Sequence, residues 1–225
     1  MIRKFLLTTA LAVTAALAAP SASQAAFTLT FQSGLITTVV TDNVGIDTNS
    51  AVGVIGVANL SINGYTLKEY GATSSSPGQE GGEFVLSQFG KIKGVGTGPL
   101  LTITAFSDGF ISSYAGLSVS NRLASSLLQS GSISGQTTVT PGGMSPISTL
   151  NGPGYDEEIF DTTTSSPFAM SNEFKISGLK ATKNSTTSLT SVAVSVVPAP
   201  AGLILAALGL PAFGLLRRKF SKVVA

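Results

Sequence analysis

The densest group of side chains that could carry chemistry is Asp156-Glu157-Glu158, with Asp161 close behind it. Hard cations such as calcium bind several carboxylate and carbonyl oxygens, so these four residues are candidate calcium ligands. A bolder interpretation is a pair of carboxylates for glycoside hydrolysis. The plainest one is a solvated acidic turn, because the cluster follows Gly152-Pro153-Gly154. All three interpretations stay open from the sequence.

Composition excludes several other kinds of catalytic chemistry. The chain of 225 residues contains no histidine and no cysteine. A Ser-His-Asp triad, a histidine metal site, thiol catalysis and thiolate zinc sites are therefore impossible. The glycine-rich stretch 94–98 lacks the Lys-Ser/Thr ending of a phosphate-binding loop and is interpreted as a turn.

Two further features allow weaker functional readings. Asp42, Asn43, Asp47 and Asn49 form a second possible calcium group, but their spacing is not that of an EF-hand loop and favours turn chemistry. A carbohydrate platform has few large aromatic residues to draw on, since the chain has four tyrosines and no tryptophan. The phenylalanines, placed in alternating segments, are expected in the core.

Charge is distributed unevenly along the chain. Six of the thirteen basic residues lie in the two ends, which leaves the body with seven basic and eleven acidic residues and a net charge of about −4. Binding to nucleic acid depends on clustered lysine and arginine, so we expect no nucleic-acid partner.

The elements that must position these residues are predicted to be β-strands. Short runs rich in β-branched residues, separated by Gly, Pro, Asn and Asp, are typical of all-β proteins. Strands are predicted over 27–31, 35–41, 51–60, 65–67, 83–92, 100–106, 130–140, 168–176 and 185–196. Asn63-Gly64 predicts a hairpin between two of them. About ten short strands favour a single β-sandwich or jelly-roll-like domain.

Three segments of the body are less clear. The stretch 118–128 could be a short helix or a strand, with neither favoured. The stretch 141–155 is rich in Gly and Pro and is predicted to be a surface loop. The last strand runs directly into a proline motif, so we expect the tail to hang from a sheet edge.

The N-terminus has the three parts of a secretory signal peptide. Met1-Ile2-Arg3-Lys4 is basic, residues 5–18 are apolar, and Ser23-Gln24-Ala25 supplies small residues for cleavage between Ala25 and Ala26. An uncleaved signal anchor is the alternative. We expect a signal peptide over 1–25 and a mature β domain over 26–196.

The C-terminal segment 197–225 also has three parts. Val197-Pro198-Ala199-Pro200 is followed by an uncharged apolar run over 201–216 and then by Arg217-Arg218-Lys219. As a helix, residues 198–216 would extend roughly 28 Å, close to a hydrocarbon core of about 30 Å. The basic residues are expected to stay on the cytoplasmic side and leave the body on the other side.

This tail resembles a PEP-CTERM sorting signal, the C-terminal tag that exosortases recognise in many Gram-negative bacteria. The resemblance rests on Val197-Pro198-Ala199-Pro200, the apolar run and Arg217-Arg218. Ala199 stands where the usual signal has Glu, so the tail is similar to a VPxPA-type variant. The resemblance implies an exosortase-type processing enzyme as a partner, and a plain C-terminal membrane anchor is the alternative.

We therefore expect an exported, non-enzymatic surface protein. The inner membrane would hold it as an intermediate before it reaches the cell surface or the extracellular matrix, where exopolysaccharide is a possible partner. No cofactor is expected, apart from calcium at Asp156, Glu157, Glu158 and Asp161 if those residues form a site. The alternatives are a surface module that binds glycan or calcium, and a secreted hydrolase that uses carboxylates.

Overall fold

The computed structural model describes residues 26–75, 83–94, 98–126, 131–179 and 185–195, and the regular structure in these ranges is all β. The predicted signal peptide and the predicted sorting tail lie outside the described residues. Within these ranges, no helix is long and apolar enough to cross a bilayer. The prediction of an all-β body is confirmed for the described part of the chain.

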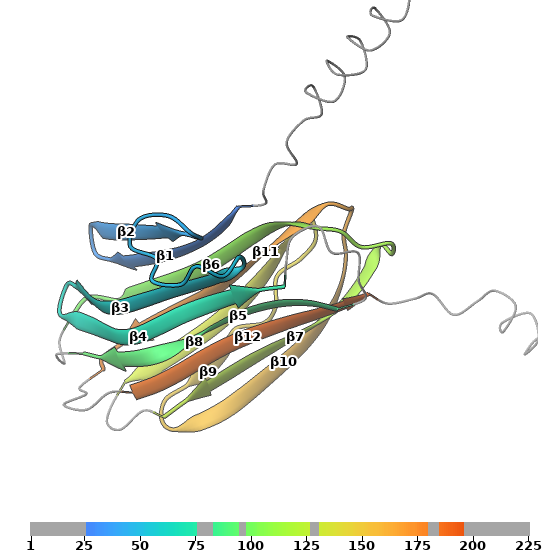
Figure 1. Cartoon of the computed structure of the whole chain (residues 1–225). Helices are drawn as coiled ribbons and strands as arrows, with labels where there is room; N and C mark the ends of the chain where they lie inside the picture. Colours follow the sequence, from blue (N-terminus) through green and yellow to red (C-terminus); the bar gives the residue numbers. More distant parts are fainter. Residues whose placement is uncertain (1–25, 76–82, 95–97, 127–130, 180–184, 196–225) are drawn as a thin grey trace, which may run out of the picture.

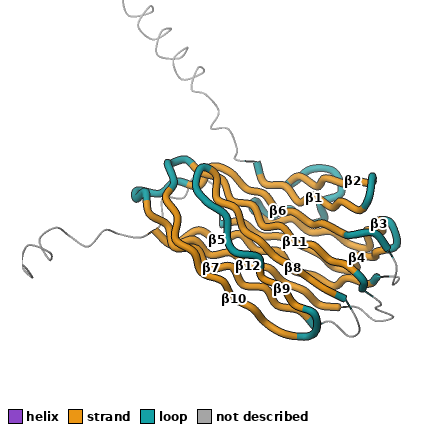
Figure 2. Tube along the Cα trace, turned by 180° about the vertical axis from the view of Figure 1, so that it is seen from behind, coloured by secondary structure: helices purple, strands orange, loops and turns teal. Residues whose placement is uncertain are grey.

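In the described ranges, twelve strands form two antiparallel sheets that face each other as a β-sandwich. They are β1 (Phe27–Ser33), β2 (Ile36–Thr41), β3 (Val54–Ile62), β4 (Tyr65–Ser74), β5 (Glu83–Lys93), β6 (Leu101–Phe110), β7 (Gly116–Ser125), β8 (Ser132–Thr140), β9 (Ser148–Leu150), β10 (Gly154–Thr163), β11 (Phe168–Ser177) and β12 (Ser185–Ser195). Sheet A has the order β2-β1-β6-β11-β8-β9, and sheet B has the order β10-β7-β12-β5-β4-β3 (Figure 1). Figure 2 shows the same two layers from behind.

The hydrophobic core lies between the sheets because the strands alternate inward and outward residues. In β1, Phe27, Leu29 and Phe31 are buried, and the threonines between them are only half-buried. Phe84 of sheet B meets Phe110 and Phe168 of sheet A, with ring centroids 5.8 Å and 5.1 Å away. Aromatic contacts therefore join the two layers at one end of the core.

A polar cluster is buried within this core and also joins the sheets. It consists of Asn172 and Thr137 from sheet A with Gln88, Asn121 and Ser191 from sheet B. Ser191 Oγ donates to Asn172 Oδ1 at 2.7 Å, and Thr137 Oγ1 donates to Asn121 Oδ1 at 2.8 Å. Asn172 Nδ2 donates to a backbone carbonyl of β5 at 2.7 Å. We call these five residues the buried polar cluster.

The predicted hairpin at Asn63-Gly64 is confirmed. These residues join β3 to β4, with φ angles of 46° and 88°. Two successive positive φ angles are those of the tight turn that matches the twist of paired strands, and Asn-Gly adopts them readily.

The segment that was ambiguous between helix and strand is a strand over its described part. Residues 116–125 form β7, which pairs with β10 on one side and β12 on the other. Its inward positions include Val119 and Leu123, but also the polar Asn121 of the buried polar cluster. A polar residue at an inward position obscured the alternation in the sequence.

Two expectations about the second half of the chain are wrong. The stretch 141–155, predicted to be a loop, contains β9 and the start of β10. The last strand, β12, does not lie at a sheet edge, since it pairs with β7 and β5 in the middle of sheet B. The segment that follows it therefore leaves from an interior strand.

Candidate functional site

The acidic cluster lies on a strand and not in a loop. Asp156, Glu157, Glu158 and Asp161 all belong to β10, an edge strand of sheet B. Asp156 and Glu158 stand opposite inward-facing positions of β7, whereas Glu157 and Asp161 stand opposite outward-facing ones. Because successive side chains point to opposite faces of a strand, the four carboxylates divide two and two. They do not converge on one ion.

The same holds for metal sites more widely in the described part of the chain. There, no three or more His, Cys, Asp and Glu side chains are grouped so that they could hold a metal ion. Asp156 instead accepts a hydrogen bond from the backbone N–H of Thr149 at 3.2 Å. That bond ties the β10 edge to the neighbouring β9.

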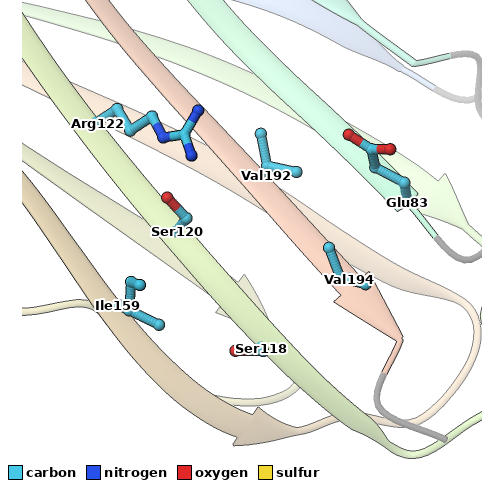
Figure 3. A pocket seen from close by; sticks show the side chains of 7 residues that line it. All are labelled: Glu83, Ser118, Ser120, Arg122, Ile159, Val192 and Val194. Carbon is cyan, nitrogen blue, oxygen red and sulfur yellow. The ribbon is translucent and has the colours of Figure 1, made fainter.

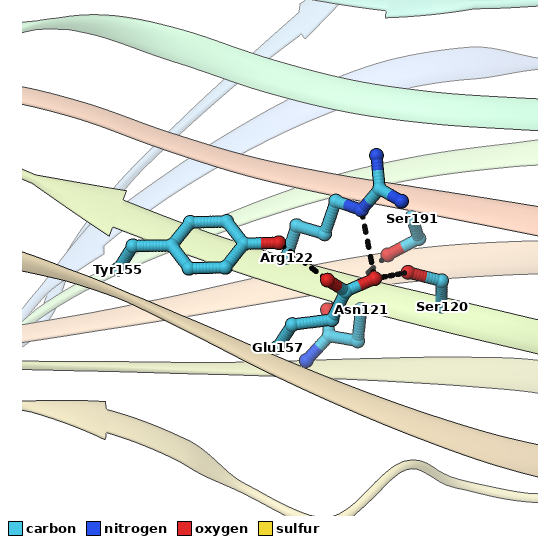
Figure 4. A network of polar contacts seen from close by, with 6 residues as sticks. All are labelled: Ser120, Asn121, Arg122, Tyr155, Glu157 and Ser191. Carbon is cyan, nitrogen blue, oxygen red and sulfur yellow. Dashed lines mark hydrogen bonds and ion pairs between the residues drawn. The ribbon is translucent and has the colours of Figure 1, made fainter.

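Glu157 is the centre of a polar network on the outer face of sheet B, the side away from the core. Its carboxylate accepts hydrogen bonds from Ser120 Oγ at 2.6 Å, Tyr155 OH at 2.5 Å and Arg122 Nε at 2.9 Å (Figure 4). These bonds, led by the one from Ser120, lower the pKa of Glu157 to about 2. Glu157 is therefore a fixed anion and an unsuitable general acid.

The second acidic group performs turn chemistry, as its spacing favoured. Asp47 accepts backbone N–H bonds from Asn43, Asn49 and Gly56 at 2.9 Å each. Asp42 accepts one from Gly53 at 2.8 Å. These bonds fix the loop between β2 and β3 and hold it beside the outer face of β3.

A straight row of residues crosses the outer face of sheet B through all six strands. The cross-strand register pairs Gly56 with Gly71, then Phe89, Ser188, Ala124 and Tyr155 in turn. Phe89 is 49% exposed and Tyr155 is 59% exposed. We call these six residues the aromatic row, because two exposed rings are aligned in it with small residues elsewhere.

The glycines of the row form a low floor beside Phe89. A Cβ on Gly56 would lie 2.8 Å from Thr48 Oγ1, and one on Gly71 would lie 2.9 Å from a backbone oxygen of β3. Gly71 therefore requires glycine on steric grounds, because its contact is with backbone, whereas the contact of Gly56 is with a side chain. An open depression of about 430 Å³ lies here, and its lining includes Thr48, Asn49 and Phe89.

Polar side chains flank the aromatic row on both sides. Lys91 Nζ lies 2.7 Å from Glu69 Oε2 on one side. On the other side, Ser87 and Thr190 hydroxyls lie 2.9 Å apart, and Arg122 is paired with Glu157.

A second depression of about 370 Å³ continues the outer face beyond these pairs. Figure 3 shows the side chains that line it on β5, β12, β7 and β10. They are Glu83, Ser118, Ser120, Arg122, Ile159, Val192 and Val194.

Sequence reasoning missed both exposed rings. The sequence predicts a core position for Phe89 as for the other phenylalanines, although in the alternation of β5 it shares the outward phase with Ser87 and Lys91. That outward phase is the signal in the sequence that identifies Phe89 as exposed. For Tyr155 the sequence predicts the end of a loop. The predicted processing residues Ala25, Val197, Pro198, Ala199, Pro200, Arg217, Arg218 and Lys219 lie outside the described residues, and Ala26 is the first described residue.

Comparisons with known proteins assign this chain to no family. It matches no protein-family model and no curated protein. Among solved structures, it is similar to an Arthrobacter globiformis isomalto-dextranase complexed with panose, at 10% identity and a TM-score of 0.26 over 59% of this chain and 24% of that one. The mosquito-larvicidal Cry4Aa toxin from Bacillus thuringiensis matches at 9% identity and a TM-score of 0.33, over 79% of this chain and 44% of that one.

A family 29 carbohydrate-binding module complexed with cellohexaose matches at 11% identity and a TM-score of 0.22, over 64% of this chain and 94% of that one. The chain spans less than half the length of the dextranase and the toxin. At these values the likenesses carry no functional argument.

Proposed function

We propose that this chain is an exported, non-enzymatic β-sandwich protein that is displayed at the cell surface or in the extracellular matrix. A signal peptide over 1–25 directs export, and the tail over 197–225 holds the chain at the inner membrane. An exosortase-type enzyme then acts near Pro198–Ala201. The sandwich is the part that is delivered.

The observation that carries the proposal is the contact of Ala26 at the start of the sandwich. Its backbone nitrogen donates to Asp108 Oδ1 at 2.6 Å, one residue before β1 begins at Phe27. Cleavage after Ala25 would turn this nitrogen into a charged amino group, and the hydrogen bond would become an ion pair. The folded body thus supplies a carboxylate where the new N-terminus would form.

The C-terminal side supports the same division of the chain. The strand β12 ends at Ser195, and Val197 opens the proline motif soon after. Because β12 is paired on both sides, the motif would emerge next to a firmly held strand.

The carboxylate alternatives have less support. A glycosidase needs two carboxyl groups that face one another across the scissile bond, one of them with a raised pKa. Every Asp and Glu in the described residues is at least partly exposed. Glu157, which accepts three hydrogen bonds from neighbouring side chains, has a lowered pKa. A non-enzymatic role is the simpler proposal.

Intact mass of the protein recovered from the cell surface and from the medium tests the proposal. We expect a species that begins at Ala26 and ends near Pro198–Ala201. A chain in which Pro198 and Pro200 are both replaced by alanine is the matched control, and it should keep its full tail. Recovery of wild-type protein that still carries Arg217 and Arg218 would establish a plain membrane anchor instead.

The N-terminal half of the proposal has its own test. Asp108→Asn should lower the thermal stability of the processed protein, because it removes the partner of the new amino group. The same change in an uncleaved chain should have a smaller effect, since only a neutral hydrogen bond is weakened. Equal effects in both forms would count against cleavage after Ala25.

A further inference from the structure

We propose that the aromatic row binds an uncharged, extended glycan, with sugar rings stacked on Phe89 and Tyr155. This inference goes beyond the sorting proposal and does not depend on it, because glycan binding by the purified chain can be measured whether or not the tail is processed in the cell.

The spacing of the rings supports a chain-like ligand. Phe89 on β5 and Tyr155 on β10 are three strand intervals apart, because β12 and β7 lie between them. At about 4.8 Å per interval the two backbone positions stand about 14 Å apart. A single sugar ring is too short to touch both, whereas an oligosaccharide that crosses the strands reaches from one to the other.

The positions between the rings leave the path open. Ser188 and Ala124 are the row residues of β12 and β7, and both are small. Beyond Phe89 the row continues over Gly71 and Gly56 to the loop residues Thr48 and Asn49. The aromatic row is therefore a line of small residues that carries two exposed rings and ends at polar loop residues. Rigid aromatic side chains lose little conformational entropy on binding, which suits them to stacking.

The flanking pairs match the hydroxyl groups along the edges of a sugar chain. Ser87 and Thr190 offer hydroxyls, and the Lys91–Glu69 and Arg122–Glu157 pairs offer donors and acceptors on opposite sides of the row. Each cation is already paired with a carboxylate, so the charges beside the row cancel. A polyanion would have to displace Glu157 or Glu69 from its partner, which favours a neutral polymer.

Direct binding to defined oligosaccharides tests this proposal. The full chain is purified in a detergent without a sugar headgroup and titrated by calorimetry with three neutral hexasaccharides, β-1,4-linked cello-, xylo- and mannohexaose. A polygalacturonate hexamer is the anionic comparison. Phe89→Ala and Tyr155→Ala each remove one ring, and Tyr114→Ala is the matched control because this tyrosine is 40% exposed but lies off the row.

We expect at least one neutral hexasaccharide to bind, and each ring deletion to weaken binding about tenfold or more, as for loss of a principal contact. Tyr114→Ala should leave the affinity unchanged. Phe89→Tyr should retain binding, because it keeps the ring. Ala124→Gln keeps both rings but places a larger side chain between them. It should therefore weaken binding, although no aromatic surface is removed as it is in Phe89→Ala.

Several results would overturn the proposal. One is the absence of binding to all three neutral hexasaccharides at millimolar concentration. Another is binding that survives both ring deletions and Ala124→Gln in variants whose thermal unfolding matches that of the wild type. Preference for the polygalacturonate hexamer, or a concentration-dependent dimer that Phe89→Ala dissociates, would assign the face to another partner.

Discussion

Replacing Asn172 with alanine should test the buried polar cluster most directly. Its side chain accepts a hydrogen bond from Ser191 Oγ and donates one to a backbone carbonyl of β5. Each buried hydrogen bond contributes about 1 kcal/mol, so the loss should be about 2 kcal/mol. For a domain of this size that lowers the melting temperature by about 4–8 °C.

The assay is reversible urea and thermal unfolding followed by tyrosine fluorescence, since the chain has no tryptophan. Tyr70 is a suitable reporter because it is buried and donates to Gln88 Oε1 at 3.1 Å. Gln88 in turn donates to the backbone carbonyl of Asn172 at 3.0 Å. Tyr70 therefore reports unfolding from a position bonded to the buried polar cluster.

Glu173→Ala is the matched control, because it changes the next residue on the same strand. Glu173 is partly exposed, and its Oε1 lies 2.5 Å from Lys175 Nζ. Exposed ion pairs of this kind usually contribute little to the free energy of unfolding. The reasoning is refuted if Asn172→Ala is no more destabilising than Glu173→Ala. A double-mutant cycle between Asn172→Ala and Ser191→Ala should also show a coupling energy of about 1 kcal/mol.

Four further predictions concern single features. Because the folded-state pKa of Glu157 is about 2, below its ordinary 4.5, its contribution to stability is present above pH 4.5 and is lost as the pH falls toward 2. The difference in melting temperature between wild type and Glu157→Gln should therefore be constant near neutral pH and shrink below pH 4.5; a difference that persists at pH 2 would contradict the network. Gly71→Ala should destabilise by about 1–3 kcal/mol in urea unfolding, because its Cβ would approach backbone, whereas Gly152→Ala has open space and should be tolerated. Replacing Asp156 and Glu158 together with threonine should speed fibril formation, measured by thioflavin fluorescence, because charges protect an edge strand from pairing with another chain. Millimolar calcium should leave the melting temperature unchanged; a rise that Asp156→Asn with Glu158→Gln removes would support the calcium hypothesis.

Much of the fold followed from local patterns. The alternation of Phe27, Leu29 and Phe31 with threonines predicted β1, and Asn63-Gly64 predicted the hairpin, because each depends on neighbours in sequence. The all-β class and the approximate number of strands could also be predicted from such local patterns. The layer arrangement did not, because it depends on which distant strands pair.

Strand β10 escaped prediction for a physical reason. Its residues are charged on both faces, since Asp156 and Glu158 alternate with Glu157 and Asp161. Such a run has no apolar period and is typical of a turn, yet an edge strand has only one paired side and tolerates charge. The acidic cluster is thus better explained by the edge position than by a shared ligand.

The aromatic row could not be derived from the sequence. Phe89 and Tyr155 become aligned only through the registers of β5, β12, β7 and β10, each fixed by packing of the core. Outward phase alone would identify Phe89 as exposed. It would not place a tyrosine from a distant strand on the same line.

The interior position of β12 also determines when the domain can close. This strand is the last of the body, yet it lies between β7 and β5. Before it is in place, sheet B consists of two separate ribbons with unpaired edges, and its long-range pairings form slowly. For a chain that crosses the inner membrane N-terminus first, residue 195 emerges just ahead of the proposed sorting tail. The fold would then be completed at about the time when the tail reaches the membrane. Any chain released before β12 emerges would be an aggregation-prone intermediate.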